Sequence, residues 1–136
     1  MKHEYWKTYG DIIKAKVSEQ IEQGHKRFAI YPFGEIGVLV KYILNDYFQL
    51  DEEYIIDNGQ ANSKTIFRLQ EIEYEEDIYI LICSVNPASY YQIRKSILDK
   101  IPSKNIVDLF ENEYGQVEET EIYKTIARLE EFINCE

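Results

Sequence analysis

The sequence predicts a single α/β domain of three layers, built on a mainly parallel sheet of four strands. Two observations predict this class. Apolar runs of strand length alternate with segments of helical periodicity, which is the order of strand–helix–strand units. The run at 78–83 is apolar at nearly every position, as expected of a central parallel strand covered on both faces. We expect one domain over 1–136, with a helix at 3–23, a core at 27–110 and a terminal helix at about 117–134.

The first predicted element is an amphipathic helix over 3–23, since apolar residues recur at helical spacing and charged residues fill the other face. Gly24 is placed to end this helix, and Gly10 is expected to break or fray its first turns. We expect the helix to cover one face or edge of the sheet, or to serve as a partner surface. Its apolar stripe is Tyr5, Tyr9, Ile12, Ile13, Val17 and Ile21.

The stretch 27–57 predicts a strand, a tight turn, a helix and a second strand. A short apolar run at 27–31 is followed at once by the turn, after which helical spacing begins. The second strand, at 54–56, ends in a turn that contains Asn58 and Gly59. The buried stripe of the helix is predicted to be Ile36, Val40, Ile43, Leu44 and Tyr47.

The turn after the first strand carries part of a dinucleotide-binding fingerprint. Gly34 and Gly37 stand at the second and third glycine positions of G-x-G-x-x-G, which admit a diphosphate close to the backbone and allow tight helix–strand packing, respectively. Helix N–H groups and the positive end of the helix dipole would face the ligand. Pro32 departs from the pattern at the first glycine position, because its φ is fixed and it has no N–H. The pattern predicts a Rossmann-like domain, in which these glycines line a diphosphate site or only permit close packing.

Asp57 lies roughly 20 residues after the glycines, where an acidic residue usually binds a ribose hydroxyl. The alternative is a turn cap with Asn58 and Gly59. Asn86, in a loop at the same sheet edge, is expected to cap a helix or to contact a ligand. The candidate binding residues are Pro32, Phe33, Gly34, Glu35, Ile36, Gly37, Asp57, Asn58, Ser84 and Asn86.

The rest of the chain continues the alternation. We expect an irregular or one-turn crossover at 58–72, a helix from Asn86-Pro87 to near Ile101, and a strand at 105–109. With right-handed crossovers, the expected strand order is 3-2-1-4. The stripe of this helix is Tyr90, Ile93, Ile97, Leu98 and Ile101, and that of the terminal helix is Ile122, Ile126, Leu129 and Ile133.

Composition excludes several classes of function. The formal net charge of −10 and the pI of about 4.7 would repel nucleic acid and an anionic membrane. No run approaches the about 18 apolar residues of a membrane span, and the first residues lack the apolar core of a signal peptide. We therefore expect a cytoplasmic protein. Cys83 and Cys135 are far apart and have no metal-ligand spacing, so neither a disulfide framework nor a metal site is expected.

The sequence assigns no catalytic residue. The polar residues expected at the carboxyl edge of the strands form no recognised triad or metal set, so enzymatic activity is left open. Cys83 is expected to be a small buried residue rather than a nucleophile, because no motif ties a histidine to it.

Three motifs between Arg27 and Phe110 carry a resemblance to a known class of domain. They are Ile30-Tyr31-Pro32-Phe33-Gly34-Glu35-Ile36-Gly37, Tyr54-Ile55-Ile56-Asp57-Asn58, and Ile80-Leu81-Ile82-Cys83-Ser84 with Tyr91-Gln92-Ile93 and Leu98 behind it. The order resembles small Rossmann-type domains of bacterial surface-polysaccharide and sugar-modification proteins, such as the N-terminal half of β-helical sugar acetyltransferases. The resemblance implies binding of a nucleotide or nucleotide sugar, and a partner enzyme that carries out the reaction. NAD(P) is the other candidate cofactor, because of the partial dinucleotide fingerprint at Gly34 and Gly37.

A second hypothesis is a protein-interaction or regulatory subunit that has kept the architecture and lost the nucleotide pocket. Pro32 and the two flanking amphipathic helices favour it. We also expect a homodimer or a hetero-complex built through the terminal helices. The alternative is that both helices complete the core of the monomer.

Overall fold

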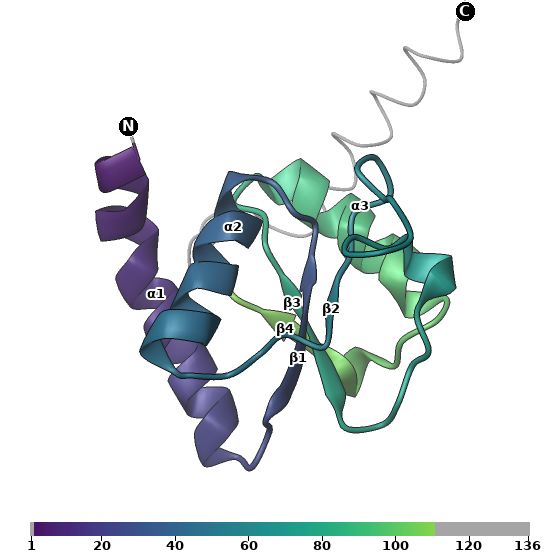
Figure 1. Cartoon of the computed structure of the whole chain (residues 1–136), viewed down its shortest axis with the longest axis horizontal. Coiled ribbons are helices and arrows are strands. Elements are labelled where there is room, and N and C mark those ends of the chain that lie inside the picture. Colours follow the sequence, from purple (N-terminus) through teal and green to yellow (C-terminus); the bar gives the residue numbers. More distant parts are fainter. Residues whose placement is uncertain (1, 111–136) are drawn as a thin grey trace, which may run out of the picture.

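The computed structural model describes residues 2–110, in which four strands form one parallel sheet with helices on both faces (Figure 1). β1 (Arg27–Tyr31) pairs with β2 (Tyr54–Ile55) on one side and with β3 (Ile78–Ile82) on the other. β4 (Ile106–Asp108) pairs with β3 at the far edge. The predicted α/β class and parallel sheet are confirmed, and each strand overlaps its predicted position. The predicted terminal helix at 117–134 lies outside the described residues.

The predicted strand order 3-2-1-4 is wrong, since the observed order is β2-β1-β3-β4. The prediction placed the second strand inside the sheet, where both of its faces would need cover. β2 is too short for that position: it has two residues, of which Tyr54 is only partly buried. β1 and β3 have five residues each and are almost wholly buried. The two longest apolar runs therefore take the centre, and β2 lies at an edge.

Two helices cover one face of the sheet, α1 (Lys2–Glu22) and α2 (Glu35–Tyr42) (Figure 1). The predicted break at Gly10 is wrong, because α1 continues through it; the predicted stop at Gly24 is confirmed by a φ of +91° just after the helix. Ile13 and Val17 of the predicted stripe are fully buried, so this part of α1 completes the monomer core. The side chain of Tyr5 lies outside the described part.

The other face is covered by α3 (Pro87–Leu98) and by the connection from β2 to β3, which contains the 3₁₀ turn η2 (Leu69–Glu71) (Figure 1). This agrees with the predicted one-turn crossover. α3 begins as predicted, but Leu98 is 44% exposed and the helix ends there, before Ile101. Ile101 is still buried, because the chain turns back after the helix and its N–H donates to the carbonyl of Ile97.

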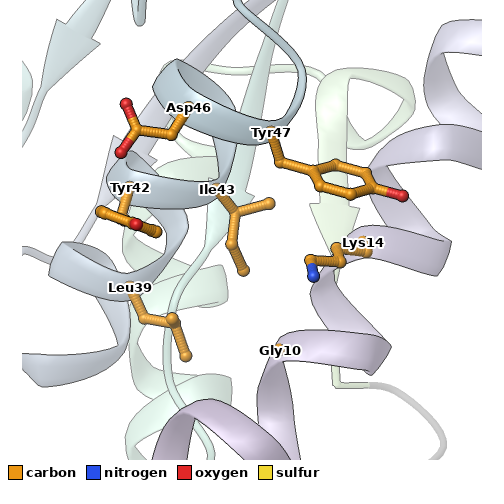
Figure 2. A pocket seen from close by; sticks show the side chains of 7 residues that line it. All are labelled: Gly10, Lys14, Leu39, Tyr42, Ile43, Asp46 and Tyr47. Atoms are coloured by element: carbon orange, nitrogen blue, oxygen red, sulfur yellow. The ribbon is translucent and has the colours of Figure 1, made fainter.

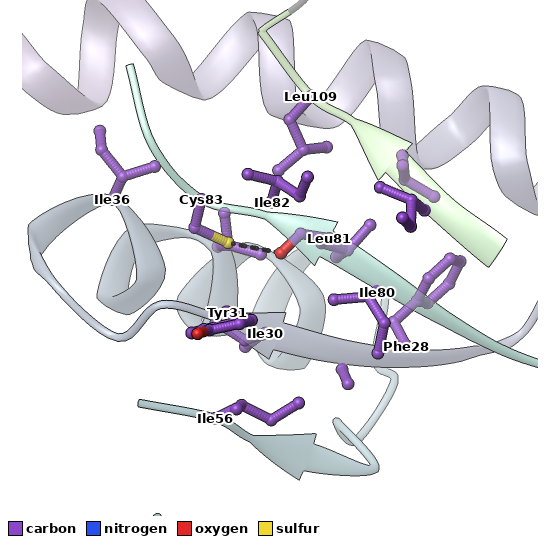
Figure 3. Close-up of a cluster of buried hydrophobic side chains, with 14 of the residues drawn as sticks. Phe28, Ile30, Tyr31, Ile36, Ile56, Ile80, Leu81, Ile82, Cys83 and Leu109 are labelled. Atoms are coloured by element: carbon purple, nitrogen blue, oxygen red, sulfur yellow. Dashed lines mark hydrogen bonds between the residues drawn. The ribbon is translucent and has the colours of Figure 1, made fainter. Parts of the chain in front are cut away.

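The core lies on both faces of β1 and β3. Ile30 and the neighbouring side chains of these strands are aliphatic or aromatic, and the two strands run side by side in Figure 3. Phe28, Ile30, Ile80, Leu81 and Ile82 are each exposed by 1% or less. A rigid central pair of this kind fixes the positions of the loops that leave its carboxyl ends.

A π-helical turn, η1 (Ile43–Tyr47), directly follows α2. After it, the Phe48 N–H donates to the carbonyl of Ile43 over 3.1 Å, five residues back. Because a π turn holds an extra residue, it shifts the helical phase of the residues at its end. The predicted burial of Tyr47 is therefore wrong: its side chain is 60% exposed, although the four preceding residues of the stripe are buried as predicted.

Candidate functional site

The candidate site lies at the carboxyl edge of the sheet, between β1 and β3. The chain passes from β1 to β2 on one side, then crosses back to β3 and β4 on the other. Ligands of open parallel sheets bind at such a switch point, outside the carboxyl ends of the strands. The turn 32–34 and the loop 83–86 leave neighbouring strands here, so the candidate residues at 32–37, Ser84 and Asn86 share one edge.

Gly37 holds α2 close to the end of β1. A Cβ added to Gly37 would lie 2.4 Å from the carbonyl oxygen of Pro32 and 3.3 Å from Cδ1 of Phe33. No side chain fits between the first turn of the helix and this loop. The packing role of the third fingerprint glycine is thus shown for Gly37. The peptide bond before Pro32 is cis.

Gly34 has a different environment. It is the N-cap of α2 with a φ of −90°, and no side chain caps the helix there. A Cβ at this position would meet no atom within 4 Å. Neither packing nor backbone conformation therefore requires a glycine, and the residue leaves open space in front of the helix N-terminus. Such a position suits an anionic group, although the carboxylate of Glu35 in the first turn competes for the same dipole.

Asp57 joins the turn after β1 to the turn after β2. Its Oδ2 accepts hydrogen bonds from the N–H of Phe33 at 3.0 Å and from Nε2 of Gln60 at 3.1 Å. Its Oδ1 accepts from the N–H groups of Gly59 at 2.9 Å and of Gln60 at 3.1 Å. Each oxygen thus has two protein donors, which fills the usual capacity of a carboxylate. The turn-capping alternative is what the structure shows, and a ribose hydroxyl would have to displace one of these bonds.

Gln60 is a site residue that the sequence reasoning missed. Its Nε2 also donates to the carbonyl oxygen of Phe33 at 2.7 Å, so both backbone polar groups of Phe33 are bonded to the β2 turn. The local spacing carried a signal, because an Asp followed by N–H groups two and three residues later is typical of a side-chain-capped turn. The bonds to Phe33 span 24 and 27 residues and have no such signal.

Three further candidate residues, Asn58, Ser84 and Asn86, also form protein contacts. Asn58 Oδ1 accepts from the N–H of Leu69 at 3.0 Å, and its Nδ2 lies 3.5 Å from the hydroxyl of Tyr31. Asn86 Oδ1 accepts from the N–H of Ser89 at 3.0 Å, which confirms the predicted cap of α3. Ser84 Oγ lies 3.5 Å from the carbonyl oxygen of Asn86. These residues shape the loops around the switch point.

A second group that the sequence reasoning missed lies at the end of β4. The hydroxyl of Tyr90 donates to Oδ1 of Asp108, and Nε of Arg94 lies 3.5 Å from the same oxygen. Burial and the neighbouring carboxylate raise the pKa of Tyr90 well above its usual range, so its proton stays on the phenol. The group places a partly buried cation, Arg94, at the carboxyl edge, one strand away from the switch point.

Cys83 directly follows β3 but cannot serve as a ready nucleophile. Its side chain is 3% exposed, and its thiol donates to the carbonyl of Leu81 at 3.3 Å (Figure 3). Burial raises the pKa of Cys83 to about 12, whereas the attacking species in thiol chemistry is the thiolate. The predicted structural role of this cysteine is confirmed.

We predict that Cys83 resists thiol reagents until the protein unfolds. With Cys135 replaced by serine, Cys83 is the remaining one of the two cysteines. At pH 8 a pKa of about 12 leaves about one thiol in 10,000 ionised. Ellman's reagent should therefore modify the folded Cys135→Ser variant very slowly and the urea-unfolded variant at once. Rapid modification of the folded variant would contradict the buried position.

Metal ligands do not gather at the site or elsewhere in the described part of the chain. Within residues 2–110, no group of three or more His, Cys, Asp or Glu side chains is arranged to hold a metal ion. None of the helices described there has the length and apolar character needed to cross a membrane.

No family model, curated protein or solved structure matches the chain.

Proposed function

We propose that the chain binds a nucleotide or nucleotide sugar at the carboxyl edge of its sheet and acts in the cytoplasm with a partner enzyme of bacterial polysaccharide or sugar modification. The observation that carries the binding proposal is the open, uncapped N-terminus of α2 at Gly34, beside the switch point between β1 and β3. The biological setting follows from the sequence resemblance.

In this proposal, the phosphates lie in front of Gly34 and Glu35, where backbone N–H groups and the helix dipole favour negative charge. Asp57 acts as a positioning residue, because its bond to the Phe33 N–H fixes the turn that carries Gly34. The sugar or base extends toward the loop of Ser84 and Asn86, which leaves the adjacent strand.

A thermal-shift panel tests the proposal. UDP, UDP-sugars, NAD, NADP and S-adenosylmethionine are each added to the folded full-length chain. A ligand at 100 times its dissociation constant raises the free energy of unfolding by about 2.7 kcal/mol, which is readily measured. We expect a nucleotide or nucleotide sugar to give the shift.

Gly34→Leu supplies the matched variant. The leucine would project into the open space at Gly34, so the variant should fold normally and lose the shift. Lys95→Met, an exposed change on α3, should keep it. A panel without any stabilising member, or a shift that survives Gly34→Leu, counts against binding at this turn.

The second candidate function is a protein-interaction or regulatory subunit without a nucleotide pocket. It is favoured by the turn after β1, in which both backbone polar groups of Phe33 are already satisfied by Asp57 and Gln60. Light scattering of the full-length chain addresses the accompanying expectation of a homodimer. A concentration-independent monomer that binds a nucleotide would exclude this candidate.

A further inference from the structure

A hollow lies between α1 and the C-terminal end of α2. It is therefore at the other end of α2 from the turn 32–34. It has a volume of about 260 Å³ and is open to solvent (Figure 2). Its walls come from three elements, α1, α2 and η1. The lining residues are Gly10, Lys14, Leu39, Tyr42, Ile43, Asp46 and Tyr47.

Two irregular features of the helices face each other across this hollow. Gly10 is buried in the middle of α1, although glycine is the least favourable residue of a helix interior after proline. A Cβ on Gly10 would meet no atom within 4 Å, so close packing does not explain the glycine. On the other side, η1 is a π turn, a form that is rare and is often found at functional sites. Both features leave the same space open.

The walls combine an apolar floor with one cation. Leu39 and Ile43 are almost fully buried and point into the hollow in Figure 2. The ammonium of Lys14 lies 4.5 Å from the centre of the Tyr47 ring and faces the same space. Within residues 2–110, Lys14 forms no ion pair with a carboxylate. Asp46 lies across the hollow from the ammonium (Figure 2). A half-buried cation with an aromatic neighbour and an apolar floor suits a ligand that is anionic at one end and apolar at the other.

We propose that this hollow binds a small aromatic carboxylate. The carboxylate pairs with the ammonium of Lys14, and the ring lies against Leu39 and Ile43 with Tyr47 at its edge. The volume is just below the roughly 300–1,000 Å³ of pockets for drug-sized ligands, which favours a single ring over a nucleotide. The site is separate from the carboxyl edge and does not depend on the proposed nucleotide binding.

The test uses phenylacetate as the anionic probe and 2-phenylethanol as the neutral one of similar shape. Both are titrated into the isotope-labelled full-length chain while backbone amide shifts are recorded by NMR. We expect saturable shifts at Gly10, Leu39 and Tyr47 with phenylacetate. Loss of a charge-assisted contact in Lys14→Met should weaken phenylacetate about tenfold and leave 2-phenylethanol unchanged.

Gly10→Leu and two control variants complete the design. The leucine should fill the hollow, abolish binding of both probes and raise Tm, because leucine favours the helix. Lys95→Met, an exposed lysine change on α3, and Gly34→Leu should leave phenylacetate binding unchanged, which separates this site from the nucleotide proposal.

Three results would overturn the proposal: no saturable shift at the hollow, equal weakening of both probes by Lys14→Met, or binding that survives Gly10→Leu. If Gly10→Leu does not fold, the proposal is still tested by the NMR shifts of the parent chain and by the effect of Lys14→Met on the two probes. Conversion of a dimeric parent to a monomer by Gly10→Leu, with no phenylacetate binding, would show that a second copy of the chain occupies the hollow.

Discussion

Replacing Asn105 with leucine is expected to lower the free energy of unfolding by about 3 kcal/mol. Asn105 is fully buried in the 3₁₀ turn η3 (Ser103–Asn105) that precedes β4. Its Nδ2 donates to the carbonyl oxygens of Glu76 at 2.7 Å and Ile78 at 3.0 Å, and its Oδ1 accepts from the hydroxyl of Tyr74 at 2.9 Å. Leucine would leave these partners without their bonds, and each unsatisfied buried polar group costs about 1–3 kcal/mol.

Urea denaturation of the purified variants measures this loss. Tyr74→Phe removes one of the bonds and should cost about 1 kcal/mol. Lys104→Ala, an exposed change in the same turn, should stay within about 0.5 kcal/mol of the parent. If Asn105→Leu lowers the free energy of unfolding by less than Tyr74→Phe does, the Asn105 amide does not hold the start of β3 to β4.

The positions of the strands and helices could be predicted because their signals are local. The apolar run at 27–31, the Asn86-Pro87 start of α3 and the glycine stop at Gly24 each act within a few residues. The strand order could not be read in this way, since it depends on competition between distant strands for the buried centre. The relative lengths of the apolar runs were the available signal, and they favoured β1 and β3 over β2.

The exposure of Tyr47 illustrates the same limit within one helix. A regular helical period predicts its burial, but Asn45 donates to the carbonyl of Leu50 at 2.9 Å and to Glu52 at 3.0 Å, beyond the helix end. Lys41 binds both Asn45 and Glu52 at 2.8 Å. These contacts hold the end of the π turn and the chain beyond it, and periodicity contains no information about them.

At the candidate site, the sequence predicted which residues lie together better than it predicted which contacts each of them makes. Residues that follow parallel strands necessarily meet at one edge, so the grouping of Gly34, Ser84 and Asn86 followed from the strands alone. The role of Asp57 depends on Phe33 and Gln60, and the bond to Phe33 requires the two turns to be neighbours in space. Ligand binding at this edge stays a prediction.

The two fingerprint glycines are expected to respond differently to the same substitution. Gly37→Ala should lower the free energy of unfolding by about 2 kcal/mol, whereas Gly34→Ala should change it by no more than about 0.5 kcal/mol. The Cβ that Gly37→Ala introduces would lie 2.4 Å from the carbonyl oxygen of Pro32, a backbone atom that moves only if α2 shifts away from β1. Overpacking of this kind costs about 1–3 kcal/mol.

The gain in helix propensity opposes this overpacking cost at Gly37, because alanine is more favourable than glycine in a helix by about 1 kcal/mol. A clear net loss of stability in Gly37→Ala would therefore show that α2 lies as close to Pro32 as the structure places it. Gly34 is a matched comparison, since it has an ordinary φ of −90° and open space at the Cβ position. Chemical denaturation of both variants decides the point. Equal stabilities would mean that α2 does not pack closely against the turn after β1 at Gly37.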